Sequence, residues 1–590
     1  MDVKFKLLAE VAKGSPRHIR RLSEYSTTFE DADVGLVEAV LPFVAGGPSK
    51  PLGHYREVFS TPVITDPQAL AAINSLKFLS SFCLLADRPG VPFDMDRTSA
   101  LLASHWSSIQ RWVELFVVLD YNLTTWSDFI VRVSLAGSPL QERLMKDPPT
   151  VSLAIKIFVA CPPRSMSKAR ALEHHWTVNF MMYSFFVQED GAQTACEIMT
   201  SNINRSEDVI LSVFRRLKYI KTTYPNDDEC SGNAVHQIRY LYTVINNAFL
   251  NTRLLSSVHD SRIASCFRLG AVALWSILAS EPPLPTETTI WLDLMQVLNI
   301  TIAWTFHGEH CPIKSLTTLL GCKLLDLLLL ALAHTPVNSL AHREGLAGLE
   351  LLATCVVYRP IWSRINLPPL NPPLFQKLPL EAMLILQGLR LNLSNARSLW
   401  PSAVPMNYYC DFIEVVVAFG IAPRYAKKEI GSLVTSLNAR FSNDKRSYMP
   451  MSIKFDLLAY LLQYAVSSNA QPTTVTHLAK LASPEHRVII IDHRSSRSDV
   501  TLACLQDYVE HMSEYPSHIV PRLESLLHAR FSLREVRLIH GIFNYGSRNA
   551  HVFLRTSWRT ADRRQPLILL GVCFIHDVID LGIAPPCTCA

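Results

Sequence analysis

Glycine is scarce in this chain, and so are the glycine-rich turns that separate short strands in β proteins. The 590 residues include 21 glycines and 36 prolines. Because glycine supplies tight turns and proline marks loops, this composition favours helices joined by proline-containing loops. Net charge is also low. A formal charge of +5 argues against binding of nucleic acid or anionic lipid by the surface as a whole.

Catalytic and nucleotide-binding signatures are missing from the sequence. It contains no GxxxxGK[ST] phosphate loop, no GxGxxG after a strand, no GxSxG elbow and no protein-kinase set. No signal-peptide pattern follows Met1, and most of the thirteen cysteines stand alone in apolar segments. Isolated cysteines are typical of buried thiols in a reducing compartment. We therefore expect an intracellular protein, in the cytoplasm or the nucleus, without a cofactor.

One apolar segment, SLTTLLGCKLLDLLLLALAH (315–334), approaches the length of a membrane span. Lys323 and Asp326 lie near its middle, where each would cost about 2.5–3.5 kcal/mol at a bilayer centre. Their i,i+3 spacing allows them to pair on a helix. We therefore predict a helix buried inside the protein and no contact with a membrane.

Apolar residues recur at helical spacing through most of the chain. In SEDVILSVFRRLKYIKTT (206–223) they fall on one face of a predicted helix. The other segments with a helical pattern are 67–85, 97–119, 235–257, 261–280, 340–357, 380–394, 410–419, 449–468, 516–529 and 533–545. Helix–loop units of about 20–45 residues predict an all-α fold, an irregular armadillo/HEAT-like α-solenoid of stacked helices.

The proline-rich stretch 366–380 is the longest of its kind and predicts a rigid, extended crossover. It divides the chain into an N-terminal helical region, 1–365, and a C-terminal helical region, 381–590.

Two histidine-containing motifs are candidate sites. HGEHC groups His307, Glu309, His310 and Cys311, but neither a CxxC nor an HExxH pattern accompanies it, so a polar turn is favoured over zinc. EHHW could set Glu173 beside His174 or His175 as a general base. No nucleophile is tied to this pair by spacing, and a core helix carrying Trp176 is favoured instead.

The segment RVIIIDHRSSRSDV (487–500) contains the strongest strand signal. We interpret it as a lone apolar run that enters a helix capped by Ser496–Asp499, with Asp492 and Arg494 bracing the turn. Catalysis would require His493 to line a pocket with a second titratable group. The predicted helix places four residues on one face: Val500, Cys504, Tyr508 and Met512.

Arginine is concentrated in residues 521–564, where nine arginines, three acidic residues and no lysine give a net charge of +6. Arginine suits bidentate carboxylate or phosphate partners, and interleaved aromatic residues can stack on bases. The alternative is that these arginines cover helix faces. The candidate contacts for an anion or a nucleic acid are Arg548, Arg555, Arg559, Arg563 and Arg564.

Two stretches, AKGSPRHIRRLSEYS (12–26) and the segment 507–551, resemble helical proteins of mushroom-forming fungi that often carry a MYND-type zinc finger. Such a finger needs paired CxxC ligands, and this sequence offers Cys587 and Cys589 at CxC spacing. The resemblance therefore implies a helical scaffold that lacks the finger, or whose finger is truncated, and zinc is carried over to no residue.

The leading hypothesis from the sequence is thus a non-enzymatic helical scaffold that binds protein partners on an extended surface. Nucleic-acid or acidic-partner binding through the arginine region is the second hypothesis. A helical enzyme with an unrecognised site, near His174/His175 or His307/His310, is the third.

Overall fold

The structure is a computed structural model that describes most of the chain up to Leu399 and, beyond it, mainly strands. The described residues are 9–11, 16–25, 34–61, 64–83, 94–121, 123–135, 138–160, 167–224, 231–250, 260–278, 287–307, 312–365, 367, 377–399, 409–411, 414–416, 457, 460, 461, 487–494, 499–504, 520, 536–545, 548–557 and 567–576.

The chain divides into two compact units, Met1–Pro282 and Pro283–Ala590. The predicted crossover at 366–380 lies within the second unit, and most of it falls outside the described residues. The helices that flank it, α18 (Leu340–Thr354) and α21 (Leu380–Leu399), pack against each other. Both flanks of this proline-rich stretch therefore belong to one compact unit.

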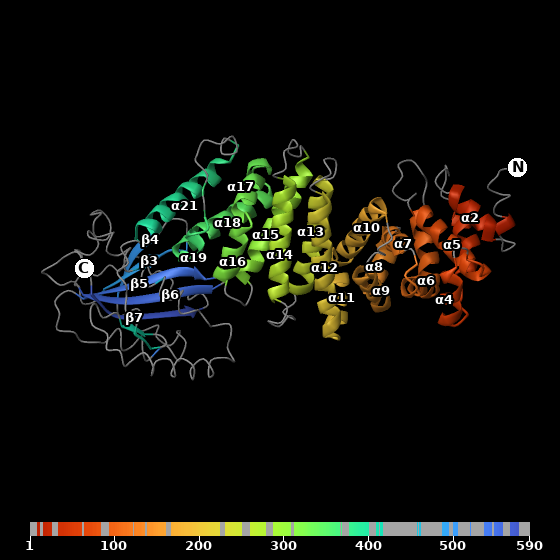
Figure 1. The fold of residues 1–590 in the computed structure, drawn as a ribbon, viewed down its shortest axis with the longest axis horizontal. Helices are drawn as coiled ribbons and strands as arrows, with labels where there is room; N and C mark the ends of the chain where they lie inside the picture. Colours follow the sequence, from red (N-terminus) through yellow and green to blue (C-terminus); the bar gives the residue numbers. More distant parts are fainter. Residues whose placement is uncertain are drawn as a thin grey trace. The chain divides into compact units, whose positions relative to one another are not determined.

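The described elements of the first unit are all helical (Figure 1). They are α2 (Pro16–Tyr25), α3 (Val34–Val40), the 3-10 helix η2 (Leu41–Phe43), α4 (Leu52–Ser60), α5 (Pro67–Cys83), α6 (Met95–Val118), α7 (Leu123–Leu135), α8 (Ser138–Lys146), α9 (Pro148–Val159), α10 (Lys168–Val187), α11 (Glu189–Thr200), α12 (Ile203–Thr223), α13 (Ser231–Ile245), the π-helix η5 (Asn246–Leu250) and α14 (Asp260–Leu278).

Side-chain caps begin several of these helices. Asp94 accepts a hydrogen bond from Arg97 N at 3.0 Å at the start of α6. Asp147 does the same for Thr150 N at the start of α9, where prolines occupy the first turn. Such caps satisfy backbone N–H groups that have no partner within the helix. The local sequence therefore fixes where these helices begin.

Helices of the first unit pack in two series. One runs α2, α5, α7, α10 and α13, each against the next, and the other runs α9, α11, α12 and α14. The apolar face predicted for 206–223 is buried in α12, where Val209, Val213 and Ile220 are fully inaccessible. Burial of these faces supplies the main favourable free energy of the unit.

The second unit begins with helices and continues with strands (Figure 1). Besides α18 and α21, its helices are α15 (Thr288–His307), α16 (Pro312–Gly321), α17 (Leu324–His334), the 3-10 helix η6 (Cys355–Val357) and α19 (Arg359–Trp362).

The segment 315–334 was expected to be one helix, and that expectation is wrong. Lys323 adopts φ 68°, a left-handed conformation that interrupts the helical hydrogen bonds, and α16 and α17 meet at a bend of 72°. The predicted pairing is confirmed, because Lys323 Nζ lies 3.4 Å from Asp326 Oδ2. Among the described residues no single helix is long and apolar enough to cross a membrane. The bent pair α16 and α17 reaches that length and composition only when the two helices are taken together.

The strands of the second unit form one seven-stranded sheet, ordered β1-β2-β7-β6-β5-β3-β4. Of its pairings, β3 with β5 is parallel and the others are antiparallel. The strands are β1 (Tyr409–Asp411), β2 (Glu414–Val416), β3 (Arg487–Asp492), β4 (Asp499–Cys504), β5 (Val536–Tyr545), β6 (Arg548–Ser557) and β7 (Leu567–His576).

The sheet corrects part of the all-α prediction, although the described residues are mostly helical, as expected. Segments 410–419 and 533–545 contain strands where helices were predicted. The run at 487–492 is not a lone strand, and the helix expected after Ser498 begins instead as β4. Short apolar runs rich in Val and Ile suit either element, and pairing with distant strands decides between them. Most of 449–468 and 516–529 lies outside the described residues.

Candidate functional site

The sheet brings charged and histidine side chains from three strands to one face. Asp492 of β3 pairs with Ile542 of β5, which pairs with His551 of β6. His540 lies two residues before Ile542 on β5. Because paired residues share a face and alternate residues return to it, Asp492, His540 and His551 lie on one face of the sheet, where the carboxyl end of β3 meets the middle of β5.

The carboxylate of Asp492 is bound by Arg494. Arg494 N donates to Asp492 Oδ1 at 2.9 Å, Nε lies 3.0 Å from both carboxylate oxygens, and Nη2 donates to Oδ2 at 2.6 Å. A charge-assisted, forked contact of this kind fixes the backbone as well as the side chain. The prediction that these two residues brace the turn is therefore confirmed.

His540 and His551 form a hydrogen-bonded pair in the interior. Their Nε2 and Nδ1 atoms lie 2.9 Å apart, and the His540 ring stacks on Phe553 at 4.0 Å. Burial, followed by the nearby His551 and Arg494, holds the pKa of His540 well below its usual value. A neutral imidazole can donate from one ring nitrogen to the other ring, so this pair is a structural hydrogen bond at neutral pH.

His493 continues the strand ladder but lies apart from this pair. Its backbone N donates to Ile542 O at 2.8 Å, and its ring stacks on Phe543 and meets Tyr460 edge-on. It is 3% exposed, and burial lowers its pKa to about 3. The aromatic packing and the low pKa indicate a core residue, so the condition set for catalysis at this turn is not met.

Asn544, near the end of β5, ties the sheet to the helices before it. Its side-chain amide donates to Thr354 Oγ1 and to Arg494 O, both at 3.0 Å. In return, the Tyr358 hydroxyl donates to Asn544 O at 2.7 Å. These three hydrogen bonds join the end of α18 and the segment after η6 to the braced turn. The turn that resembles an active-site edge therefore connects the helices to the sheet.

The arginine region is described only in part. The backbones of Arg548 and Arg555 lie on β6, an inner strand paired with both β5 and β7. Arg559, Arg563 and Arg564 lie outside the described residues. Binding of an anion or nucleic acid through these arginines stays a prediction.

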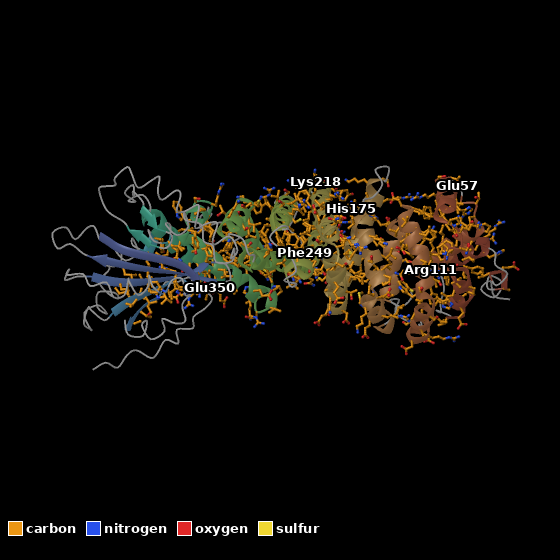
Figure 2. All side chains as sticks on the ribbon, turned by 90° about the horizontal axis from the view of Figure 1, so that it is seen from below. Glu57, Arg111, His175, Lys218, Phe249 and Glu350 are labelled. Atoms are coloured by element: carbon orange, nitrogen blue, oxygen red, sulfur yellow. The ribbon has the colours of Figure 1, made fainter. Side chains whose placement is uncertain are left out.

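The EHHW motif lies on α10, and both of its histidines are buried; His175 is labelled in Figure 2. His174 is 0% exposed, with Nδ1 3.0 Å from Thr124 Oγ1 of α7. His175 is 7% exposed and stacks on Tyr219 of α12 at 4.0 Å. Burial, followed by the charge of Arg216, lowers their pKa values to about 3 and about 2. Both are therefore neutral at physiological pH.

Arg216 of α12 connects these helices, although the sequence interpretation did not single it out. It is 2% exposed, and its guanidinium donates to His175 Nδ1 at 3.1 Å, to Asn179 Oδ1 at 3.3 Å and to Phe158 O at 2.9 Å. Asn179 Nδ2 in turn donates to Gln237 Oε1 of α13 at 3.0 Å. We call these residues, with His174, the buried arginine network.

The buried arginine network links α7, α9, α10, α12 and α13. A general base needs a pKa near the working pH and access to its substrate, and these histidines have neither. Burial raises the pKa of three described free thiols, Cys83, Cys266 and Cys355, to about 12, so these three are poor nucleophiles at neutral pH. The chemistry of the network is therefore internal hydrogen bonding between helices.

The HGEHC motif is described at one residue, His307, the last residue of α15. Glu309, His310 and Cys311 lie outside the described residues. Within the described part of the chain, no group of three or more His, Cys, Asp or Glu side chains is placed to hold a metal ion.

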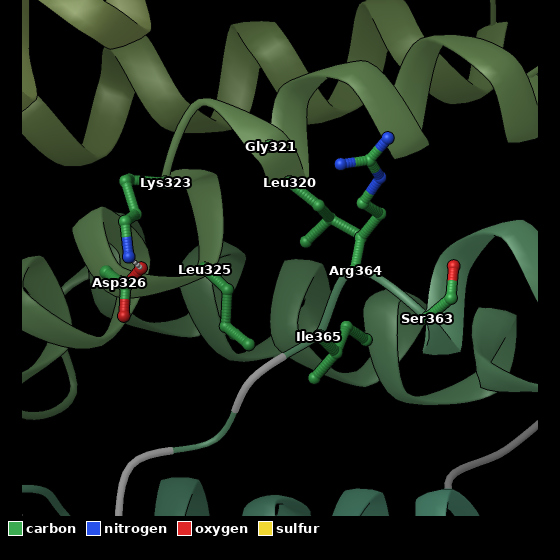
Figure 3. A pocket seen from close by; sticks show the side chains of 8 residues that line it. All are labelled: Leu320, Gly321, Lys323, Leu325, Asp326, Ser363, Arg364 and Ile365. Carbon is green, nitrogen blue, oxygen red and sulfur yellow. Dashed lines mark ion pairs between the residues drawn. The ribbon is translucent and has the colours of Figure 1, made fainter. Parts of the chain in front are cut away.

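A surface cleft of about 430 Å³ lies where α16, α17 and the end of α19 meet (Figure 3). Figure 3 shows the Lys323–Asp326 ion pair on one side and Arg364 on the other, with Leu320, Leu325 and Ile365 between them. The remaining lining residues are Gly321 and Ser363.

No protein-family model, no curated protein and no solved structure matches this chain.

Proposed function

We propose that this chain is a non-enzymatic helical scaffold that binds a protein partner. The supporting observation is the packing of the first unit, in which each helix of a series contacts the next one along. Nearest-neighbour packing of this kind is the pattern of armadillo- and HEAT-like solenoids, whose stacked helices present extended binding surfaces. An irregular α-solenoid is therefore the architecture we propose for this unit.

The hydrogen bonds of the buried Arg216 and the half-buried Asp492 also support this proposal. Arg216 and Asp492 engage neighbouring groups by three or more hydrogen bonds each, and the histidines beside them are neutral at physiological pH. Groups used in this way hold helices and strands in register. The alternative, binding of nucleic acid or an acidic partner through residues 521–564, predicts a different contact region and can be tested in the same experiment.

Cross-linking with an amine-reactive reagent tests the proposal. Four exposed lysines lie on four of the helices from α8 to α12: Lys146 of α8, Lys156 of α9, Lys168 of α10 and Lys218 of α12. We expect a partner captured from extract, then purified and mixed with the full chain, to cross-link to several of these lysines. Protection of 521–564 from proteolysis, without such cross-links, would favour the arginine region. If no purified protein binds the chain, the scaffold proposal is wrong.

A further inference from the structure

We propose that the cleft between α16, α17 and α19 binds a short peptide segment in which an acidic side chain adjoins apolar ones. This inference rests on the proposed function, because it names the chemistry of the partner that the scaffold would bind.

The charges of the cleft favour a carboxylate. Lys323 is neutralised by Asp326, its neighbour at 3.4 Å. Arg364 is exposed, and its guanidinium makes no hydrogen bond or ion pair with any residue that the structure describes. The lining therefore has one uncompensated positive charge, and it belongs to arginine, whose planar fork matches a carboxylate. A single arginine suits Asp or Glu, whereas phosphopeptides are typically bound by arginine clusters.

The size of the cleft favours a short peptide. Leu320, Leu325 and Ile365 lie between the two charged sides (Figure 3). A volume of about 430 Å³ is near the lower end of the range for ligand sites, about 300–1,000 Å³. It can accommodate a few side chains of an extended segment. Because Ser363 and Arg364 are exposed, a bound segment would keep one side in water, as surface-docked peptides do.

Gly321 provides a way to fill the cleft without disturbing the helix. A Cβ atom added at Gly321 would meet no heavy atom within 4 Å, and its φ is not in the left-handed region. Gly321→Leu therefore places a side chain at the lining, while Arg364→Gln removes the charge. Arg343→Gln is a matched control, because Arg343 is an exposed arginine of α18 that does not line the cleft.

The probes are three fluorescein-labelled peptides with Gly-Ser flanks, containing Leu-Glu-Leu, Leu-Leu-Glu or Glu-Leu-Leu, each with a glutamine counterpart. We expect fluorescence anisotropy with the full chain at low salt to show at least one glutamate peptide binding about tenfold more tightly than its counterpart. Arg364→Gln should abolish this preference, and Gly321→Leu should weaken both peptides. Arg343→Gln should change neither, and thermal unfolding should confirm that all variants are folded.

If none of the three glutamate peptides is preferred, or if Arg343→Gln has the same effect as Arg364→Gln, the inference is wrong. Its failure is distinguishable from failure of the proposed function. A partner cross-linked along α8–α12 without peptide binding would overturn this site and leave the scaffold standing. Peptide binding without any protein partner would support this site and overturn the proposed function.

Discussion

Replacing Arg216 with methionine removes the central donor of the buried arginine network while keeping an unbranched aliphatic stem. Phe158 O keeps a donor, because Ser212 Oγ also donates to it at 2.7 Å. His175 Nδ1 and Asn179 Oδ1 each lose the hydrogen bond from Arg216. The perturbation is therefore the loss of donors to two buried acceptors.

The magnitude follows from these two acceptors. A buried polar atom deprived of its partner costs about 1–3 kcal/mol, so two of them cost about 2–6 kcal/mol. Removing a desolvated charge offsets part of this cost. We expect Arg216→Met to lower the free energy of unfolding by about 2–4 kcal/mol. It should also raise the pKa of His175, because the charge of Arg216 contributes to lowering that pKa to about 2.

A double-mutant cycle measures the contact itself. His175→Phe alone leaves a guanidinium N–H without its acceptor, whereas combined with Arg216→Met it removes both partners. Removal of both partners is close to neutral for that contact, so the double variant should be more stable than additivity predicts, by about 1–2 kcal/mol.

Urea unfolding followed by circular dichroism gives the four free energies. Lys218→Met on the same helix is the control, because Lys218 is exposed and should change stability by less than about 0.5 kcal/mol. Additive effects of Arg216→Met and His175→Phe would refute the reasoning, as would an Arg216→Met protein as stable as the wild type.

Five of the described histidines have pKa values lowered mainly by burial: His174, His175, His342, His493 and His540. These histidines take up protons on unfolding below pH 6.5. The free energy of unfolding should therefore fall as the pH is lowered from 6.5 to about 3, with a limiting slope of about 1.4 kcal/mol per pH unit for each histidine. A flat pH profile in urea titrations would contradict this. Gly270→Ala should destabilise the protein by about 2–3 kcal/mol, since the added Cβ would clash with the buried Tyr242 hydroxyl, whereas Gly321→Ala should be neutral or stabilising. Similar melting shifts for both variants would show that the packing argument fails. Asn544→Ala removes one hydrogen bond to Thr354 of α18 and one to Arg494 O in the turn after β3. It should cost about 1–3 kcal/mol and increase amide exchange near Arg494, and unchanged exchange there would count against the proposed connection.

Helical periodicity predicted the helices well and the strands poorly, for a physical reason. A helix buries a face whose residues are close in sequence, as Val209, Val213 and Ile220 do in α12, so the pattern is local. The run at 488–491 has no such local partner. It becomes part of a sheet because residues 536–545 pair with it, and no short-range signal in the sequence encodes that pairing.

The sequence predicted the burial of the histidines of the candidate site but neither their arginine partner nor the cleft. Burial of His174 and His175 follows from their position on an apolar helix, as the sequence interpretation favoured. Arg216 gave a signal that was missed, because it falls three residues after Val213, on the buried face of α12. Such a buried arginine predicts a partner on another helix but does not identify it. The cleft was not predictable, since Lys323 and Arg364 are separated by forty-one positions and a bend between two helices.

The distribution of charge between interior and surface supports the proposal of a scaffold. An enzyme keeps titratable groups accessible and sets their pKa values near the working pH. Here burial lowers the pKa values of the interior histidines far below the working pH. The hydrogen bonds of Arg216 go to neighbouring helices. Arg364, at the surface, keeps its charge without a counter-charge among the described residues. A rigid interior with an uncompensated surface charge is suited to recognising a partner, and the peptide experiment tests that charge directly.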